Sequence, residues 1–137
     1  MQIYSHILSI RISHSALDPD LVTRTLGLTP EVTWKAGEPR KTPKGTLLKG
    51  TRSSGYWTTD PFGYGWRESP EATVEDGLEE LVSFLEPHRD YLRGIAQDGR
   101  VEIWASTQSD RNFAIELAPH MLLRIGTLGA SLVHDVY

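Results

Sequence analysis

The five histidines are the residues that could most directly provide chemistry, because imidazoles bind metal ions. His6 and His14 fall on one face of a predicted strand, but they are eight residues apart, which in extended chain is roughly 27 Å and too far for a shared ion. The sequence has no His-x-His pair, no His-Glu-x-x-His motif and no acidic calcium loop. We therefore expect neither a metal nor a cofactor.

Motifs for covalent catalysis are also missing. Ser53-Ser54-Gly55 is typical of an ordinary turn and lacks the Gly-x-Ser-x-Gly pattern of an activated serine. Lys44-Gly45-Thr46 matches the end of a phosphate-binding loop, but the upstream glycine and the following helix are absent. The chain has no cysteine, which excludes disulfides, thiolate metal sites and cysteine nucleophiles. The sequence thus favours a protein that is not an enzyme.

Aromatic and basic side chains gather near both ends of a basic loop, where they could bind a partner. Rings beside Arg and Lys make good anchors in binding sites. The candidate binding surface consists of Trp34, Lys35, Arg40, Lys41, Tyr56 and Trp57. The alternative is that the tryptophans cap the ends of the core. Trp104 alternates with apolar residues and is predicted on the less buried face of its strand.

The charge of the chain is unevenly distributed. A net charge of −4 argues against nucleic acid as a partner, since that partner needs a basic surface. Residues 35 to 52 hold six basic residues against one acidic residue, a net of +5, whereas residues 60 to 90 hold nine acidic residues against two arginines, a net of −7. The two segments are either separately solvated surfaces or a dipole that orients a charged partner.

Length and composition indicate one soluble globular domain over residues 1–137, in which 37–70 form an irregular hairpin and loop insert. No apolar run approaches the roughly 20 residues that span a bilayer, and no basic region with an apolar block opens the chain. We therefore expect a cytoplasmic protein without a membrane partner. We also expect 40–54 to be the most mobile internal segment.

Alternation of apolar residues predicts a half-buried strand over Ile3–Ser13. Asp18 and Pro19 predict the start of a short helix that Gly27 ends. Thr73 caps a second helix that runs to about Leu85, before Pro87 breaks it. The residues expected in the core are Ile10, Leu26, Leu81, Leu85, Ile103 and Ile115.

The last third of the chain is predicted to contain a hairpin, a helix and a strand. Residues 101–105 and 113–117 both alternate and are assigned to the hairpin, followed by a helix over about 119–128 and a strand over 131–137. Residues 17–24 also align with 117–124 as a weak repeat. Two β-α-β-type units predict an α+β fold of the ferredoxin-like kind, with a mainly antiparallel sheet and helices on one face.

Several segments together resemble a bacterial family catalogued as domain of unknown function 4279. They are Ser9-Ile10-Arg11-Ile12, Leu17-Asp18-Pro19, Leu26-Gly27-Leu28-Thr29-Pro30, Gly37-Glu38, Tyr56-Trp57, the helix from Leu78 to Leu85, Leu128-Gly129 and Asp135-Val136-Tyr137. The resemblance covers nearly the whole chain and implies a fold more than a chemistry. Small α+β proteins of this kind include immunity proteins that neutralise secreted toxins, which is the functional hint that the resemblance implies.

Two functions are consistent with the sequence. The first is a non-catalytic protein-binding module, with an immunity protein against a toxin as the form that the resemblance suggests. The second is a small-molecule sensor or enzyme whose pocket lies between the sheet and the 37–70 loop. A deep enclosed pocket would favour the second function, and an open charged face would favour the first. The oligomeric state is open, with a homodimer among the alternatives.

Overall fold

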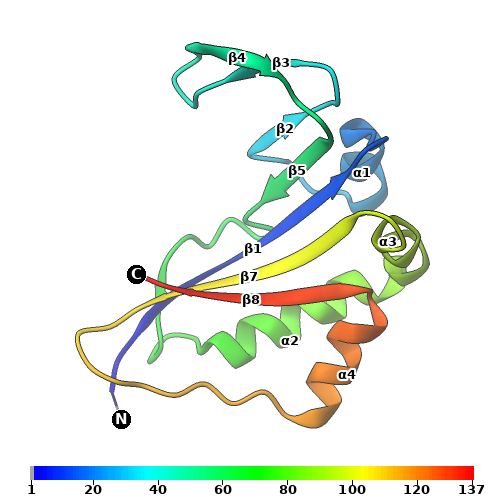
Figure 1. The fold of residues 1–137 in the computed structure, drawn as a ribbon. Helices are drawn as coiled ribbons and strands as arrows, with labels where there is room; N and C mark the ends of the chain where they lie inside the picture. Colours follow the sequence, from blue (N-terminus) through cyan, green and yellow to red (C-terminus); the bar gives the residue numbers. More distant parts are fainter. Residues whose placement is uncertain (1) are drawn as a thin grey trace.

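Strand β1 (Ser5–His14) lies at the centre of the fold in the computed structural model, which describes residues 2–137 (Figure 1). It pairs antiparallel with β5 (Gly55–Thr59) on one side and β7 (Arg100–Gln108) on the other. The short strand β6 (Arg67–Glu68) extends the pairing near the start of β1. The predicted alternation is confirmed, because the row from Tyr4 to Ile12 is buried while the intervening residues are half-exposed.

The sheet has the order β2-β5-β1-β7-β8. Strand β2 (Val32–Trp34) is antiparallel to β5, and β8 (Ala130–Val136) is parallel to β7. The path β1-α1-β2-β5-α2-β7, with the spatial order β2-β5-β1-β7, is compatible with the ferredoxin-like arrangement. The fold is therefore α+β with a mainly antiparallel sheet, as expected, and β8 adds one parallel strand at its edge.

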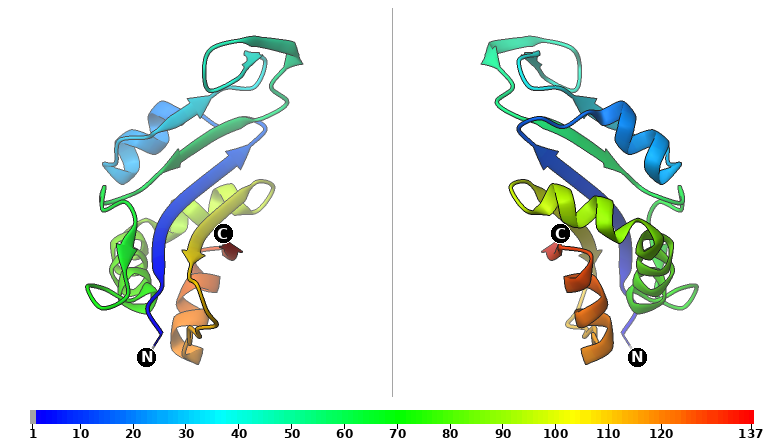
Figure 2. Two further views of the ribbon diagram at one scale, coloured as in Figure 1. Left: turned by 90° about the vertical axis from the view of Figure 1, so that its left-hand side faces the viewer. Right: turned by 90° about the vertical axis from the view of Figure 1, so that its right-hand side faces the viewer.

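The helices cover one face of this sheet. They are α1 (Pro19–Leu26), α2 (Val74–Leu85), the 3₁₀ turn η1 (Glu86–His88), α3 (Arg89–Ala96) and α4 (Pro119–Thr127). The right-hand view of Figure 2 shows them in front of the strands. Their apolar residues share one core with the buried row of β1. Among the residues that the structure describes, no helix lies on the other face of the sheet, which is called the open face here.

Local signals in the sequence set the helix ends as predicted. The Asp18 carboxylate accepts hydrogen bonds from backbone N–H groups at the start of α1. Gly27 ends the helix in the left-handed conformation, with a φ of 68°. Thr73 and Asp76 form a reciprocal capping box at α2. The break that Pro87 predicts is present as η1.

Five of the six predicted core residues are fully or almost fully buried, namely Ile10, Leu26, Leu81, Leu85 and Ile103. The exception is Ile115, which is only partly buried against the core. Ile115 was assigned to a strand of the sheet, but it lies in the irregular connection between β7 and α4. A residue outside the sheet is shielded on one side only, which explains its partial exposure.

The predicted hairpin between 101–105 and 113–117 is wrong. The first segment belongs to β7, which pairs with β1 and β8, whereas residues 113–117 form no strand. The second β-α-β unit also differs from the predicted one: β5 and β7 flank β1 and are joined through α2 and α3. Helix α4 instead connects the parallel neighbours β7 and β8.

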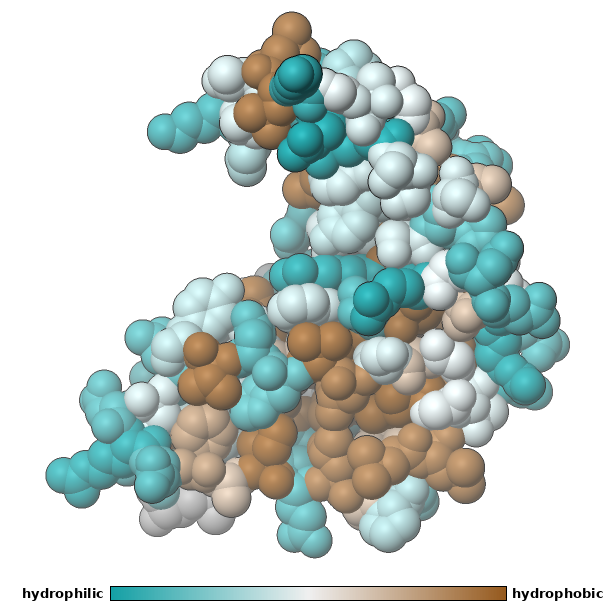
Figure 3. Space-filling view, viewed as in Figure 1, coloured by the Kyte–Doolittle hydropathy of each residue, from teal (hydrophilic) through white to brown (hydrophobic). Residues whose placement is uncertain are grey.

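The 37–70 insert contains a hairpin, as expected, but not between the two extended pieces predicted at 46–49 and 55–59. It is formed by β3 (Pro39–Lys41) and β4 (Leu47–Thr51) as a separate two-stranded sheet, whereas 55–59 is β5 of the main sheet. Figure 1 shows it at the top of the molecule, beyond the end of the main sheet. Figure 3 shows the space-filling surface hollowed between this hairpin and the body below it. The hairpin therefore overhangs the sheet as an arm.

Candidate binding surface

The pairing register determines which side chains share the open face. Residues directly opposite on neighbouring strands point to the same side of a sheet. Arg11 is opposite Thr58 of β5 and Glu102 of β7, and Trp34 is opposite Tyr56. The open face therefore carries two sets of aromatic and charged residues, one near the β3–β4 hairpin and one over β1 and β7.

The first set is built on Trp34, at the end of β2. Its ring stacks on Tyr56 with centroids 4.5 Å apart and an interplanar angle of 25°. The Arg52 guanidinium carbon lies 3.7 Å from the centroid of the Trp34 ring, which is cation–π geometry. Because Arg52 covers Trp34, the base of the hairpin lies on the open side of the sheet. We call Trp34, Arg52 and Tyr56 the aromatic–arginine cluster.

Arg52 also ties the hairpin to the rest of the chain. Its backbone N–H donates to Glu38 O and its carbonyl accepts from Gly37 N, both at 2.8 Å. Its Nη2 donates to Lys41 O at 3.1 Å. One arginine thus fixes both strands of the arm and stacks on the sheet.

The side chain of Arg52 still has an unused donor. Its Nε is buried and has no hydrogen-bond partner among residues 2–137. An open hollow of about 330 Å³ is lined by Trp34, Arg40, Thr51, Arg52, Ser53 and Ser54. A guanidinium with a free N–H favours a carboxylate or another anion as its ligand. The hollow opens to solvent and is no deep enclosed pocket.

The second set lies over the middle of the open face. The Arg11 guanidinium carbon is 3.7 Å from the centroid of the Trp104 ring. Glu102 accepts two hydrogen bonds on this face. Arg100 Nη2 donates to its Oε2 at 3.1 Å, and Trp104 Nε1 donates to its Oε1 at 3.5 Å. Two arginine–tryptophan pairs therefore stand on the same face of the sheet.

Five of the six predicted site residues lie on the surface near the hairpin. Trp34 and Tyr56 are half-buried on the open face, and Lys35, Arg40 and Lys41 are exposed. The placement of Trp57 is wrong. Its side chain is 0% exposed on the core face of β5, and its Nε1 donates to Thr23 Oγ1 of α1 at 3.0 Å. Tyr56 and Trp57 are neighbours in one strand, so they point to opposite faces.

The candidate surface predicted from the sequence lacks Arg11, Arg52 and Trp104. Arg52 was counted among the basic residues, but its stacking on Trp34 depends on the path of the hairpin. Arg11 and Trp104 lie on the polar faces of two strands with alternating sequences. This pattern in the sequence could have indicated that both side chains lie on the open face. Their contact was missed because 101–105 had been paired with 113–117 and not with β1.

Charge separates along the molecule. The basic segment 35–52 forms the hairpin arm, and much of the acidic segment lies on and around α2, at the other end of the view in Figure 1. Near α2, the aromatic turn of residues 62–66 packs back on the body. The Phe62 ring packs edge-on against Phe84, with ring centroids 5.6 Å apart. Tyr64 OH donates to Glu80 Oε2 at 3.2 Å, and this hydrogen bond raises the pKa of Tyr64. Phe62 and Tyr64 therefore make contacts within the chain, which explains why this turn packs on the body.

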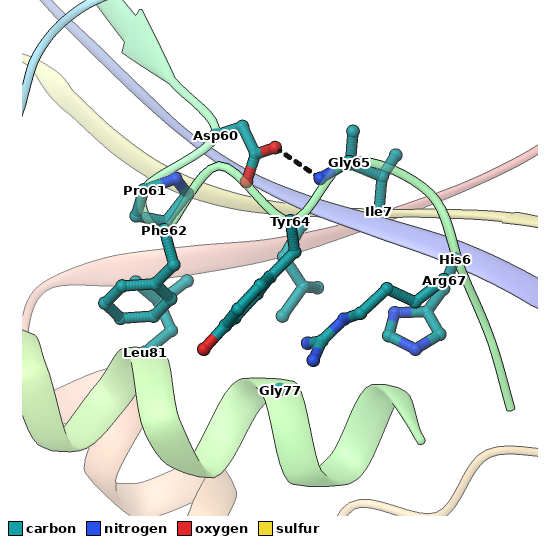
Figure 4. A pocket seen from close by; sticks show the side chains of 11 residues that line it. His6, Ile7, Asp60, Pro61, Phe62, Tyr64, Gly65, Arg67, Gly77 and Leu81 are labelled. Atoms are coloured by element: carbon teal, nitrogen blue, oxygen red, sulfur yellow. Dashed lines mark hydrogen bonds between the residues drawn. The ribbon is translucent and has the colours of Figure 1, made fainter. Parts of the chain in front are cut away.

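The pocket beneath this turn is too small for an organic ligand (Figure 4). His6, Tyr64, Arg67 and Gly77 are among its lining residues, and its free volume is about 10 Å³. This is room for about one water molecule. The buried His6 ring bonds to Ala72 O through Nε2 at 2.7 Å, so its role is that of a core residue.

Comparison with known proteins identifies the family. The model of the family described as domain of unknown function (DUF4279) matches residues 2–137, so the chain belongs to that family. No curated protein and no solved structure matches the chain. Among the helices of residues 2–137, none has the length and apolar character needed to cross a membrane.

Proposed function

We propose that this protein is a non-catalytic binding module that holds a partner protein against the open face, beneath the β3–β4 hairpin. The observation that carries the proposal is the aromatic–arginine cluster, in which Trp34 and Arg52 line an open hollow. Stacked aromatic rings and arginines are enriched among residues that dominate binding energies. An arm and a sheet face together present a concave surface that a protruding segment can enter.

The charge of the arm favours an acidic partner. Lys35, Arg40 and Lys41 are exposed around the cluster, and the net charge of residues 35–52 is +5. Basic residues at a rim raise association rates with an acidic protein, while desolvated aromatic contacts slow dissociation. A toxin neutralised by this chain as an immunity protein is a partner of this class.

The test is binding to the protein encoded beside this chain, or to another identified acidic partner, by surface plasmon resonance. Trp34→Ala should speed dissociation, by an amount equivalent to about 2 kcal/mol if the ring is a central anchor. Arg40→Ala combined with Lys41→Ala should slow association, and added salt should reduce that difference. Trp66→Ala is the matched control, because Trp66 is a half-exposed tryptophan that contacts Tyr137 and not the cluster.

The proposal fails if the folded variants bind the partner as well as the parent does. Circular dichroism and thermal unfolding of each variant separate loss of contact from loss of structure. Trp57→Ala is unsuitable as a binding probe, since truncation of this buried ring should destabilise the fold by about 3–5 kcal/mol.

A second candidate is a small-molecule sensor or enzyme that uses the hollow at Trp34 and Arg52. The volume of about 330 Å³ is within the range of ligand pockets, and a planar anion could stack and pair there. The openness of the hollow favours the protein partner. A panel of aromatic carboxylates, followed by quenching of tryptophan fluorescence, distinguishes the two, because only the second candidate predicts saturable quenching that Arg52→Ala abolishes.

A further inference from the structure

Strand β8 forms an unprotected edge of the main sheet. It contains seven residues, none of them proline or lysine, and among residues 2–137 it pairs only with β7. Natural sheets usually shorten, charge or cover such an edge because its free N–H and C=O groups recruit another strand. The opposite edge illustrates this, since β2 has only three residues. The free side of β8 is therefore a site for strand addition.

The register shows which residues face outward. Tyr137 N–H donates to Thr107 O at 2.8 Å, and Val136 is the register partner of Thr107. In a parallel ladder every second residue directs both backbone groups to the neighbour. Residues 131, 133, 135 and 137 therefore bond to β7. The N–H and C=O groups of Leu132, His134 and Val136 point to the free side.

We propose that two copies of this chain form a homodimer by antiparallel pairing of their β8 strands about a two-fold axis at Val133. In this register Leu132 of each copy faces His134 of the other, and both have outward backbone groups, so they exchange N–H···O bonds. Val133 faces its own counterpart as a non-hydrogen-bonded pair. The two sheets then continue into one, which removes both exposed edges.

A polar group on β8 selects this register. Asp135 Oδ1 is buried and has no hydrogen-bond partner among the described residues. With the axis at Val133, Asp135 lies directly opposite Ser131 of the second copy, and their side chains share the open face. The serine hydroxyl can then donate to the carboxylate through Oδ2, the oxygen that is not buried within the single chain. Axes at Leu132 or His134 place Gly129 or Val133 opposite Asp135, and neither residue offers a side-chain donor.

The apolar surface beside β8 is self-complementary in the same arrangement. Arg124 of α4 reaches Glu79 and Glu86, on the side of α2. Leu122 is two residues away, about 200° around the helix, and therefore lies on the side away from α2. It is 52% exposed. Helix α4 packs against β8 and leads into its start, so in the proposed dimer we place Leu122 on the side of the first half of this strand.

The second half of β8 borders a hollow. It has a volume of about 570 Å³, and its lining includes Phe113, Ile115, His134 and Val136. Antiparallel pairing places the first half of one β8 beside the second half of the other. Leu122 of each copy thus approaches the part of the counterpart's hollow that Phe113, Ile115 and Val136 line, while the rest of the lining is polar or charged. Figure 3 shows hydrophobic residues gathered in the region of the surface where Figure 1 draws β8 and α4.

The first experiment measures the mass of the full chain in solution by light scattering. We expect a dimer of twice 15.4 kDa at micromolar concentrations. Leu122→Glu should shift the chain to the monomer, because it inserts a charge into the apolar contact. Leu21→Glu is the matched control: Leu21 is a half-exposed leucine on α1, which packs against β5, three strands from β8 in the sheet order, and its variant should remain dimeric. A parent chain that is monomeric at 100 µM overturns the proposal.

The second experiment tests the register with single cysteines, which the parent chain lacks. Val133→Cys should form a disulfide-linked dimer under mild oxidation, because non-hydrogen-bonded partners have Cα atoms about 4.5 Å apart. His134→Cys should not, since its counterpart there is Leu132. Cross-linking of His134→Cys in preference to Val133→Cys contradicts the axis at Val133. Far-UV circular dichroism verifies that each variant is folded.

Discussion

At the scale of single residues, Arg52 joins the hairpin to the sheet through two different properties of its side chain. Its plane stacks on Trp34, and its Nη2 donates to Lys41 O. Lysine keeps the charge but has neither the plane nor the fork of donors. The contribution of Arg52 is therefore geometric as well as electrostatic, which makes it testable by a substitution that preserves charge.

We expect Arg52→Lys to loosen the hairpin while the core remains intact. In hydrogen–deuterium exchange, the amides of Arg40, Lys41 and Leu47–Thr51 should exchange faster, whereas those of β1 and β7 should be unchanged. Lys35→Arg is the control, because Lys35 is exposed. Equal protection of the hairpin in Arg52→Lys and the parent would show that the stacking contributes nothing.

Arg124 provides a second test at this scale, through pH. Arg124 Nη1 pairs with Glu79 Oε2 at 2.6 Å, and Arg124 Nη2 pairs with Glu86 Oε1 at 2.7 Å. The hydrogen bond from Arg124 to Glu86 lowers the pKa of Glu86. A lowered folded-state pKa means that the contact stabilises the fold above the unfolded-state pKa and that this stabilisation is lost as the pH falls through the folded-state value.

The difference in unfolding free energy between the parent and Arg124→Gln should therefore be largest near neutral pH. It should shrink as the pH falls from about 6 to about 3, through and below the usual glutamate pKa of about 4.3. Urea titrations at several pH values measure it. Arg111→Gln serves as the control, since Arg111 is exposed and has no ion pair among the described residues. A difference independent of pH would contradict the linkage.

At the scale of elements, α2 contributes most directly to the core, with a continuous buried stripe on the sheet. The stripe consists of Val74, Gly77, Leu78, Leu81, Val82 and Leu85. Gly77 lies over β1 so closely that an added Cβ would approach Leu8 Cδ1 to 2.8 Å. Leu81 is fully buried in the centre of this contact.

We expect Leu81→Ala to lower the free energy of unfolding by about 2–5 kcal/mol, through lost burial and the cavity left behind. Denaturant titration measures this value. Arg24→Ala is the control on the exposed side of helix α1 and should change stability by less than about 0.5 kcal/mol. A small effect at Leu81 would be inconsistent with the packing of α2 on the sheet.

Element boundaries were largely predictable because caps and alternation are local properties. The capping box at Thr73, the stop at Gly27 and the half-buried β1 all follow from residues within one turn or one strand. Strand partners were not predictable, because alternation states which face is buried and not which strand lies alongside. This explains the wrong hairpin at 113–117 and the missed contact between Arg11 and Trp104.

At the scale of the whole molecule, the hairpin arm is attached to the body mainly at its base. Its strands pair with each other, while Leu47 and Leu48 at its far part remain exposed. A two-stranded sheet without a core beneath it is only marginally stable by itself. We therefore retain the prediction that residues 40–54 are the most mobile internal segment.

Limited proteolysis with trypsin should cut first after Lys41, Lys44 or Lys49. The exposed Arg89 and Arg93 of α3 provide an internal comparison, because a helix packed on the core resists cleavage. Mass spectrometry of early time points identifies the site. First cleavage in α3 would contradict the prediction.

The central position of β1 also determines when the chain can fold. Its two long partners begin at Gly55 and Arg100, so most of its pairings span 41 residues or more. Such non-local contacts give a high contact order and slow folding. At about 5–20 residues per second, β1 precedes β7 during synthesis by roughly 5 to 20 s. During that interval the apolar row Leu8, Ile10 and Ile12 has no completed sheet to cover it, so β1 is open to misassociation on the ribosome, whatever the stability of the finished fold.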